Sequence, residues 1–461
     1  MAMAQRNMAE LETASVWKLL VQYSLPSIAG MVVYSLYNII DSIFIGHGVG
    51  PLALSGLAIT FPIMNLTFAL GTLVGIGGAA ITSIRLGKKD REGTFLTLGN
   101  VAVLSLIASV LLATPSLIFL HEILAAFGAS GQTLSYAYDF MFITLLGLPV
   151  TYIFFNLNHV MRATGYPRKA MFSTLITVGI NITLAPVFIF WFNWGIKGAA
   201  LATLLAQVAG MARVLMHFYD GAHTVHFRQG IWKLRSSIVS GILSIGLAPC
   251  LVNVCASAVT IAINRQLVAH GGDLAVGAFG IVNRILILFA MIVIGLNQGM
   301  QPIIGYNHGA MKPERVIRTL RYGVLVGTAF TTLGFLACML LPRTIAECFT
   351  DDAQLIDLAV NGLRISMLAF PIVGSQIIIG NFFQAIGKAR LAIFLSLTRQ
   401  MLFLLPFLLI LPEFWGQTGV WASLPLADAC SFIVTMLFIR RFLRYYRDKN
   451  GLDGQQAAPA A

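Results

Sequence analysis

Twelve long apolar runs constrain the fold of this chain more than any other feature of its sequence. Each has about 20 residues or more, the length that an α-helix needs to cross a hydrocarbon layer about 30 Å thick. The runs cover residues 16–44, 51–80, 94–118, 133–158, 170–192, 196–218, 238–268, 274–305, 316–341, 355–385, 391–411 and 418–443. Only 10% of the 461 residues are charged, whereas an ordinary soluble domain has about 25%. We therefore predict an all-α integral membrane protein with twelve transmembrane helices.

Lysine and arginine are distributed unevenly between the loops that join these runs. Of the 30 Lys and Arg residues, 24 fall on one side of the predicted membrane, namely Arg6, Lys18, Arg85, Lys88, Lys89, Arg91, Arg162, Arg168, Lys169, Arg213, Arg228, Lys233, Arg235, Lys312, Arg315, Arg318, Arg321, Lys388, Arg390, Arg440, Arg441, Arg444, Arg447 and Lys449. The opposite loops hold Lys197 and Arg343. Cytoplasmic loops carry the excess of basic residues, so we predict a multi-pass protein of the plasma or inner membrane with both termini in the cytoplasm.

The same charge distribution excludes one class of partner. Basic residues that bind nucleic acid cluster on one contiguous face, whereas here they sit in separate short loops. Membrane lipids are therefore the expected surroundings, and nucleic acid is not an expected partner.

The first fifteen residues lack the apolar region and cleavage site of a removable signal, so we expect the first membrane helix to be retained.

The two halves of the chain repeat one pattern of glycine, proline and arginine. The matching residues lie 221 to 223 positions apart: Pro26 and Pro249, Gly77 and Gly299, Gly87 and Gly309, Pro149 and Pro371, Gly165 and Gly387, Arg168 and Arg390, Gly195 and Gly416, and Gly198 and Gly419. Each half holds six runs, an even number, so the two six-helix bundles should be parallel repeats related by a pseudo-two-fold axis. We predict an N-terminal segment 1–15, an N-lobe 16–218, a cytoplasmic linker 219–237, a C-lobe 238–443 and a cytoplasmic tail 444–461.

Polar residues form stripes on several of the predicted helices, because positions three, four and seven apart share a helix face. The stripes comprise Tyr34, Tyr37, Asn38 and Asp41; Tyr152, Asn156 and His159; Thr174, Thr177 and Asn181; Thr203 and Gln207; and, in the second half, Asn253, Ser257, Thr260 and Asn264. We expect the first-half stripes to line a cavity. The second-half stripe, Asn253, Ser257, Thr260 and Asn264, supplies further candidates for the substrate cavity.

Asp41 is the most informative of these residues. A carboxylate inside a membrane span costs roughly 2.5–3.5 kcal/mol by insertion scales, so it needs partners or a function. It stands close to the outer end of its run, about 6–8 Å from it at 1.5 Å per residue. One interpretation is a helix-end acid that reaches water or a neighbouring amide. The other, which we favour, is a proton or cation site, since desolvation favours the neutral form of a carboxyl group.

Two further patterns have simple structural interpretations. Arg399 and Asp428 fall in adjacent predicted helices and are expected to form a structural ion pair. His223 and His226 lack a third ligand, so the sequence predicts no metal site there.

Several motifs taken together resemble the multidrug and toxic compound extrusion (MATE) transporters over nearly the whole chain, from about Ser24 to Arg444. They are LPSIAGMVVYSLYNIIDSIFIG, RATGYPRKAM, NITLAPVFIF, WGIKGAALAT, QPIIGYNHGA, and QAIGKARLA followed by SLTRQ. The resemblance implies two lobes around a central cavity and export of amphipathic, often cationic compounds in exchange for Na+ or H+, without a cofactor. It places Asp41 at the family's helix 1 acid and Asn181 and Thr203 at two polar positions of an ion site.

The sequence departs from one branch of that family. Where that branch has N-x-x-L-D-P, this chain has Ala185 in place of the second acid. Sodium is usually held by several oxygens, so a single acid favours H+ over Na+ at Asp41. We expect the protein to act as a monomer.

Two other functions fit the sequence less well. A flippase for lipid-linked oligosaccharides would share the two-bundle layout, but holding a pyrophosphate would call for more cationic side chains than Arg284, Arg364 and Arg399 supply. An intramembrane enzyme is disfavoured, because the chain has no H-E-x-x-H or G-x-S-x-G motif.

Overall fold

The computed structural model describes residues 10–129 and 131–449, and these residues form helices and no strands. Residues 1–9, 130 and 450–461 lie outside the described ranges, and with them parts of the predicted N-terminal segment and tail. The elements are α2 (Val16–Gly48), α3 (Pro51–Gly87), α4 (Arg91–Ile118), α5 (Leu120–Ala126), α6 (Leu134–Leu146), α7 (Leu148–Ala163), α8 (Pro167–Pro186), η1 (Val187–Trp191), α9 (Gly195–Tyr219), α10 (Ser236–Gly309), α11 (Pro313–Leu340), α12 (Pro342–Glu347), α13 (Ala353–Ser366), α14 (Phe370–Ala385), α15 (Ala389–Leu397), η2 (Thr398–Leu404) and α16 (Leu405–Lys449).

The helices are long and apolar enough to cross a membrane many times. Within the described residues nine helical stretches meet that condition, and eleven do if the bent pairs α6–α7 (54°) and α13–α14 (56°) each count as one crossing. α10 contains two of the nine, parted at Gly272, where φ is 72°. The chain is therefore an all-helical, multi-span membrane protein, as the apolar runs predicted.

Polar caps and prolines set where several helices begin. The hydroxyl of Ser15 accepts a hydrogen bond from the backbone N–H of Lys18 (3.3 Å) at the start of α2. Asp90 Oδ1 accepts one from the N–H of Gly93 (2.8 Å) at the start of α4. Such caps satisfy amides that the first turn leaves free. Pro167 opens α8, where its missing N–H costs no hydrogen bond.

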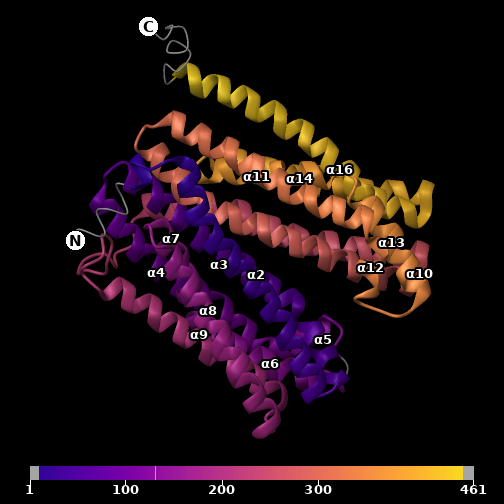
Figure 1. Cartoon of the computed structure of the whole chain (residues 1–461). Helices are drawn as coiled ribbons and strands as arrows, with labels where there is room; N and C mark the ends of the chain where they lie inside the picture. Colours follow the sequence, from indigo (N-terminus) through magenta and orange to yellow (C-terminus); the bar gives the residue numbers. More distant parts are fainter. Residues whose placement is uncertain (1–9, 130, 450–461) are drawn as a thin grey trace.

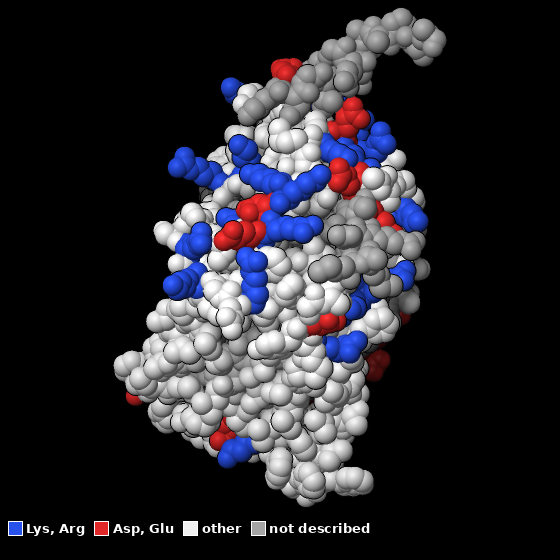
Figure 2. Space-filling view, turned by 90° about the vertical axis from the view of Figure 1, so that its left-hand side faces the viewer, with Lys and Arg blue, Asp and Glu red and all other residues white. Residues whose placement is uncertain are grey.

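Two bodies of helices lie side by side in Figure 1, the first half (α2–α9, indigo to magenta) and the second half (α10–α16, orange to yellow). We call the end of the molecule that carries the basic loops 85–91, 162–169, 228–235, 312–321 and 388–390 the basic end. Figure 2 shows lysines and arginines gathered in the upper and middle part of the view, whereas the lower part of the visible face is mostly uncharged. This distribution agrees with the loop charges read from the sequence.

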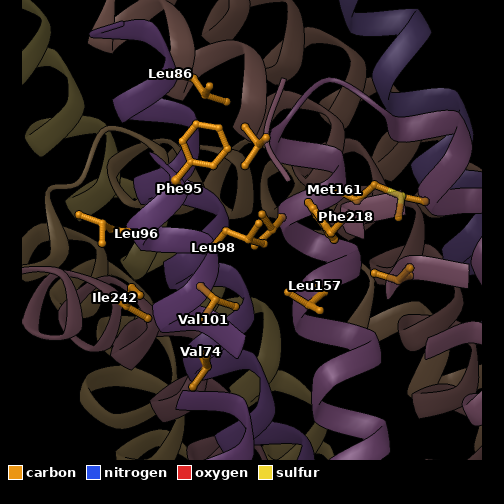
Figure 3. Packing of buried hydrophobic residues seen from close by; sticks show 14 of the residues in the cluster. Val74, Leu86, Phe95, Leu96, Leu98, Val101, Leu157, Met161, Phe218 and Ile242 are labelled. Atoms are coloured by element: carbon orange, nitrogen blue, oxygen red, sulfur yellow. The ribbon is translucent and has the colours of Figure 1, made fainter. Parts of the chain in front are cut away.

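The hydrophobic clusters differ between the two ends. Away from the basic end, each half has its own core: one around Ile45, Ala53 and Leu120, the other around Leu267, Ala275 and Trp421. Toward the basic end the cores are shared. Figure 3 shows Ile242 of α10, from the second half, near Leu96 of α4. The two halves are therefore packed together at the basic end.

Glycines allow this close packing. A Cβ added at Gly87 of α3 would lie 1.9 Å from the carbonyl oxygen of Tyr306 in α10, and one added at Gly309 would lie 2.1 Å from that of Ile84. These two contacts are reciprocal, because each glycine touches the helix that carries the other. Similar contacts follow at Gly77 with Ile242, Gly246 with Leu73, Gly295 with Ile28 and Gly299 with Ser24. We call these six glycines the glycine seam; it closes the basic end between the two halves.

The segment before α2 also crosses from one half to the other. Leu11 is fully buried, and Arg315 of α11 donates hydrogen bonds to the carbonyl oxygens of Leu11 (3.1 Å) and Ala14 (2.7 Å). The carboxylate of Glu12 forms an ion pair with Lys312 at 2.9 Å. Residues 10–15 therefore fasten the start of the first half to the second half at the basic end.

Candidate ion and substrate site in the first half

A pocket opens between four helices of the first half. Its lining comprises Tyr34 and Tyr37 of α2, Phe154 and Phe155 of α7, Thr174, Thr177, Val178 and Asn181 of α8, and Thr203, Ala206 and Gln207 of α9. The unfilled space amounts to about 320 Å³, part of it open to solvent, and the enclosed part has room for about one water molecule. In this conformation the pocket is therefore sized for an ion or a water molecule.

Hydrogen bonds link the polar side chains of this pocket. Asn181 Nδ2 donates to Thr203 Oγ1 (3.0 Å), and the hydroxyls of Tyr37 and Thr203 are 3.2 Å apart. Thr203 thus connects α2, α8 and α9. Gln207 Oε1 accepts a hydrogen bond from Thr151. Buried polar groups in such a network hold one another in fixed orientations.

Tyr34 places an aromatic face at the pocket. Its ring centroid lies 5.9 Å from that of Tyr37 and 5.8 Å from that of Phe155, the latter edge to face. Aromatic faces attract cations and lipophilic groups. The lining therefore combines polar groups with aromatic surface.

Asp41 lies on α2 one helical turn beyond Tyr37, on the same face. It does not line the pocket itself. Its side chain is buried, with 9% of the residue exposed, and Oδ1 has no hydrogen-bond partner within the described residues. α2 continues to Gly48, so Asp41 stands seven residues from the helix end, roughly 10 Å. It is deeper than the 6–8 Å expected from the sequence, because the helix extends past residue 44.

The structure brings seven of the expected polar residues together, namely Tyr34, Tyr37, Thr174, Thr177, Asn181, Thr203 and Gln207. The stripe on α7 lies elsewhere. The hydroxyl of Tyr152 donates to the carbonyl oxygen of Thr67, and Asn156 Nδ2 donates to Ser105 (2.8 Å). These side chains point toward α3 and α4, away from the pocket. The side chain of Asn38 lies outside the part of the structure that is described.

The reason for the α7 orientation is visible in α3. A Cβ at Gly71 would lie 3.2 Å from the ring of Tyr152, and one at Gly75 would lie 2.4 Å from Asn156. The two glycines make room for these side chains. The stretch GTLVGIGG (residues 71–78) indicates a site of close helix packing. The sequence alone does not say which helix packs there.

The residues of the second-half stripe are not among those that line the pocket described above. Asn253 Nδ2 donates to the carbonyl oxygen of Pro249 (2.8 Å), and Thr260 donates to that of Ala256 (2.9 Å), both within α10. Ser257 accepts a hydrogen bond from Asn65 of α3 (3.4 Å), which joins the two halves. Asn264 is half-buried.

Sequence reasoning missed the apolar part of the lining: Phe154, Phe155, Val178 and Ala206. Such residues carry no distinguishing signal, because apolar residues occur on every face of helices in this chain. Spacing from polar neighbours could have found Ala206, which stands three residues after Thr203.

Comparisons with known proteins give the family. The profile of the MatE family matches residues 26–187 and again residues 249–410. The chain belongs to the MATE family of transporters. Two curated relatives are named multidrug export protein MepA: the protein of Staphylococcus aureus strain MRSA252 is 29% identical over 95% of this chain and 96% of its own length, and that of Staphylococcus haemolyticus is 28% identical over 98% and 99%. This is a family of transporters for multidrug export, not of enzymes.

Solved MATE structures have the same fold. The MATE multidrug transporter DinF-BH, solved in complex with R6G, is 36% identical with a TM-score of 0.85, over 92% of this chain and 95% of that one. A multidrug resistance MATE family transporter of the MOP superfamily in an outward-facing conformation is 25% identical with a TM-score of 0.90, over 95% and 98%. A MATE structure in a bent conformation has a TM-score of 0.91 at 23% identity, over 96% and 99%.

Proposed function

We propose that this MATE transporter is a secondary antiporter that exports amphipathic, often cationic compounds in exchange for H+ or Na+, with Asp41 as the acid that binds the coupling ion. The observation that carries the proposal is the buried Asp41 Oδ1 without a partner, one turn from a polar pocket. A buried carboxylate without a hydrogen bond is unfavourable. Binding a proton or a metal ion removes that penalty.

The coupling ion is H+ in the form of the proposal that we favour. Sodium takes several oxygen ligands, and the pocket hydroxyls of Tyr37 and Thr203 already bond to one another or to Asn181. A proton needs one carboxylate oxygen. DinF-BH was solved in complex with R6G, and the MepA relatives are named multidrug export proteins. Both observations support small drug-like substrates for this transporter.

Twelve crossings in two parallel six-helix bundles belong to this proposal. The stretch Ala389–Asp448 has 60 residues and contains a break at Gly416, where φ is 55°. At 1.5 Å per residue it is far longer than one bilayer, so we divide it into two crossings. The two family matches begin 223 residues apart, the spacing at which Pro26 and Pro249 align. The division into an N-lobe and a C-lobe, a monomeric state and cytoplasmic termini complete the proposal.

Transport then follows from alternating access. The closed basic end, which we assign to the cytoplasm, and the likeness to an outward-facing transporter support an outward-facing state for this conformation. A lipophilic cation enters from the cytoplasm while Asp41 is ionised. On the outside, the binding of a proton or a sodium ion at Asp41 releases the lipophilic cation. The flippase alternative is not favoured, because the relatives above are multidrug exporters.

The test is ethidium export from cells that carry Asp41→Asn. We expect export to be lost, while the amount of protein in the membrane and its thermal stability stay at the wild-type level. Asp139→Asn is the matched control, because Asp139 forms an ion pair with Lys197 (3.4 Å) outside the pocket, and its export should persist. Unchanged export by the Asp41 variant contradicts the proposal.

A further inference from the structure

The described residues bury two acidic side chains, one in each half. Asp41 is 9% exposed and Asp428 of α16 is 3% exposed. Their partners differ. Asp41 Oδ1 has none within the described residues, whereas Asp428 Oδ1 accepts a hydrogen bond from Nε of Arg399 in an ion pair, as the sequence predicted.

Uncharged polar residues stand near the two partners along the chain. Arg399 lies in the π-helical stretch η2, next to Gln400, whose side-chain oxygen is buried without a partner. One turn beyond Asp428, Ser431 accepts a hydrogen bond from Gln376 of α14. Among the described residues, no other charged side chain forms an ion pair with Arg399 or Asp428. The charge on Asp428 is therefore balanced by Arg399.

The internal repeat relates this ion pair to the first-half pocket. Gly165 aligns with Gly387 at a shift of 222, and the same shift aligns Thr177 with Arg399. At the shift of 221 that aligns Gly198 with Gly419, Gln207 aligns with Asp428. Thr177 and Gln207 both line the first-half pocket. The ion pair thus occupies the equivalent place in the second half.

We infer that Arg399 is a built-in cation of the second half, which keeps Asp428 from taking part in ion exchange and leaves Asp41 as the one acid that exchanges an ion in each transport cycle. An arginine side chain stays protonated in proteins. It is also tethered to the chain, so the cation in this half cannot leave. The inference rests on the proposed function and adds to it the number of coupling ions.

A purely structural ion pair is the alternative. Both interpretations predict that the loss of one partner lowers stability, because the other charge remains buried. They differ in the number of ions exchanged. Only the built-in cation predicts that the removal of Arg399 creates a second exchanging acid.

The experiment measures the ratio of H+ to ethidium moved in proteoliposomes, from the pH gradient that just balances an ethidium gradient. We expect one H+ per ethidium for the wild type, two for Arg399→Gln, and one again for Arg399→Gln combined with Asp428→Asn. The glutamine amide can still bond to Asp428, which favours folding of the single variant. If H+ does not move, the same ratio is measured with Na+.

A ratio of one for folded Arg399→Gln overturns the inference, and so does a wild-type ratio of two that falls to one in Asp428→Asn. A wild type that exports ethidium without ion movement refutes the proposed function instead. If Arg399→Gln cannot be reconstituted, a second experiment uses Arg399→Met in detergent. It measures, with a pH indicator, the number of protons released when ethidium binds. That number should double relative to the wild type, and an unchanged number overturns the inference.

Discussion

Gly87→Ala should open the basic end of the transporter. The new Cβ would lie 1.9 Å from the carbonyl oxygen of Tyr306 and 2.9 Å from the amide nitrogen of Ala310. These are backbone atoms and cannot rotate away, so α3 and α10 must separate by about 1 Å to reach 3.0 Å. Overpacking of this kind costs typically about 1–3 kcal/mol. In a state with the basic end open, the helices are apart and the cost disappears.

The cost therefore acts on one conformation only. A difference of about 1–3 kcal/mol shifts the equilibrium between the two states by about 5–150-fold toward the state open at the basic end. Spin labels can be attached at exposed Glu92 and Arg390, one in each half, once the native cysteines are replaced. The shift would then appear as a larger population of molecules with a long distance between the two labels.

Gly280→Ala is the matched control, because a Cβ at Gly280 meets nothing within 4 Å. Both substitutions add one methyl group to a helix, but only the methyl group at position 87 contacts the backbone of the other half. Equal distance distributions for the two variants would refute the claim that the glycine seam holds the basic end closed.

The remaining predictions concern the segment before α2 and the pocket. Leu11→Ala should favour opening of the basic end by about 2–4 kcal/mol, because Leu11 is fully buried. Glu12→Gln should favour opening by less than about 1 kcal/mol, because the ion pair that it removes is partly exposed. The same spin labels measure both changes. The hydrogen bond from Lys312 holds the pKa of Glu12 below its ordinary value of 4.5. The contact between Glu12 and Lys312 should therefore persist at neutral pH and weaken only as pH falls through that lowered pKa. The distance between the spin labels in a pH titration measures this, and a contact that weakens near neutral pH would contradict the prediction. Thr203→Val should lower ethidium export several-fold with a folded protein, since Tyr37 and Asn181 both lose their shared partner; export equal to wild type would exclude a role for this network.

The fold was predictable from the sequence to a large extent. Apolar runs of membrane length predicted the helices, and charged loops predicted which end is basic, because a membrane imposes both features. Prolines inside apolar runs indicate bent helices, and bends are found next to Pro149, between α6 and α7, and next to Pro371, between α13 and α14. The presence of a proline does not give the bend angle, so the 54° and 56° could not be read from the sequence.

The candidate site was predictable only in part. Thr177, Asn181, Thr203 and Gln207 meet because polar residues on one face of a membrane helix must turn away from lipid. Tyr152 has the same kind of spacing and yet faces α3, since its partner is a backbone carbonyl rather than a cavity. Spacing identifies a polar face, but the rotation of the helix depends on which neighbour leaves room for it.

The most direct test of the account is ethidium transport in proteoliposomes under an imposed pH gradient, with Asp41→Asn beside the wild type. We expect the pH gradient to drive ethidium movement in the wild type, and we expect the variant still to bind ethidium but to move none against its gradient. Gradient-driven transport by the variant at the wild-type rate would show that the coupling ion binds elsewhere.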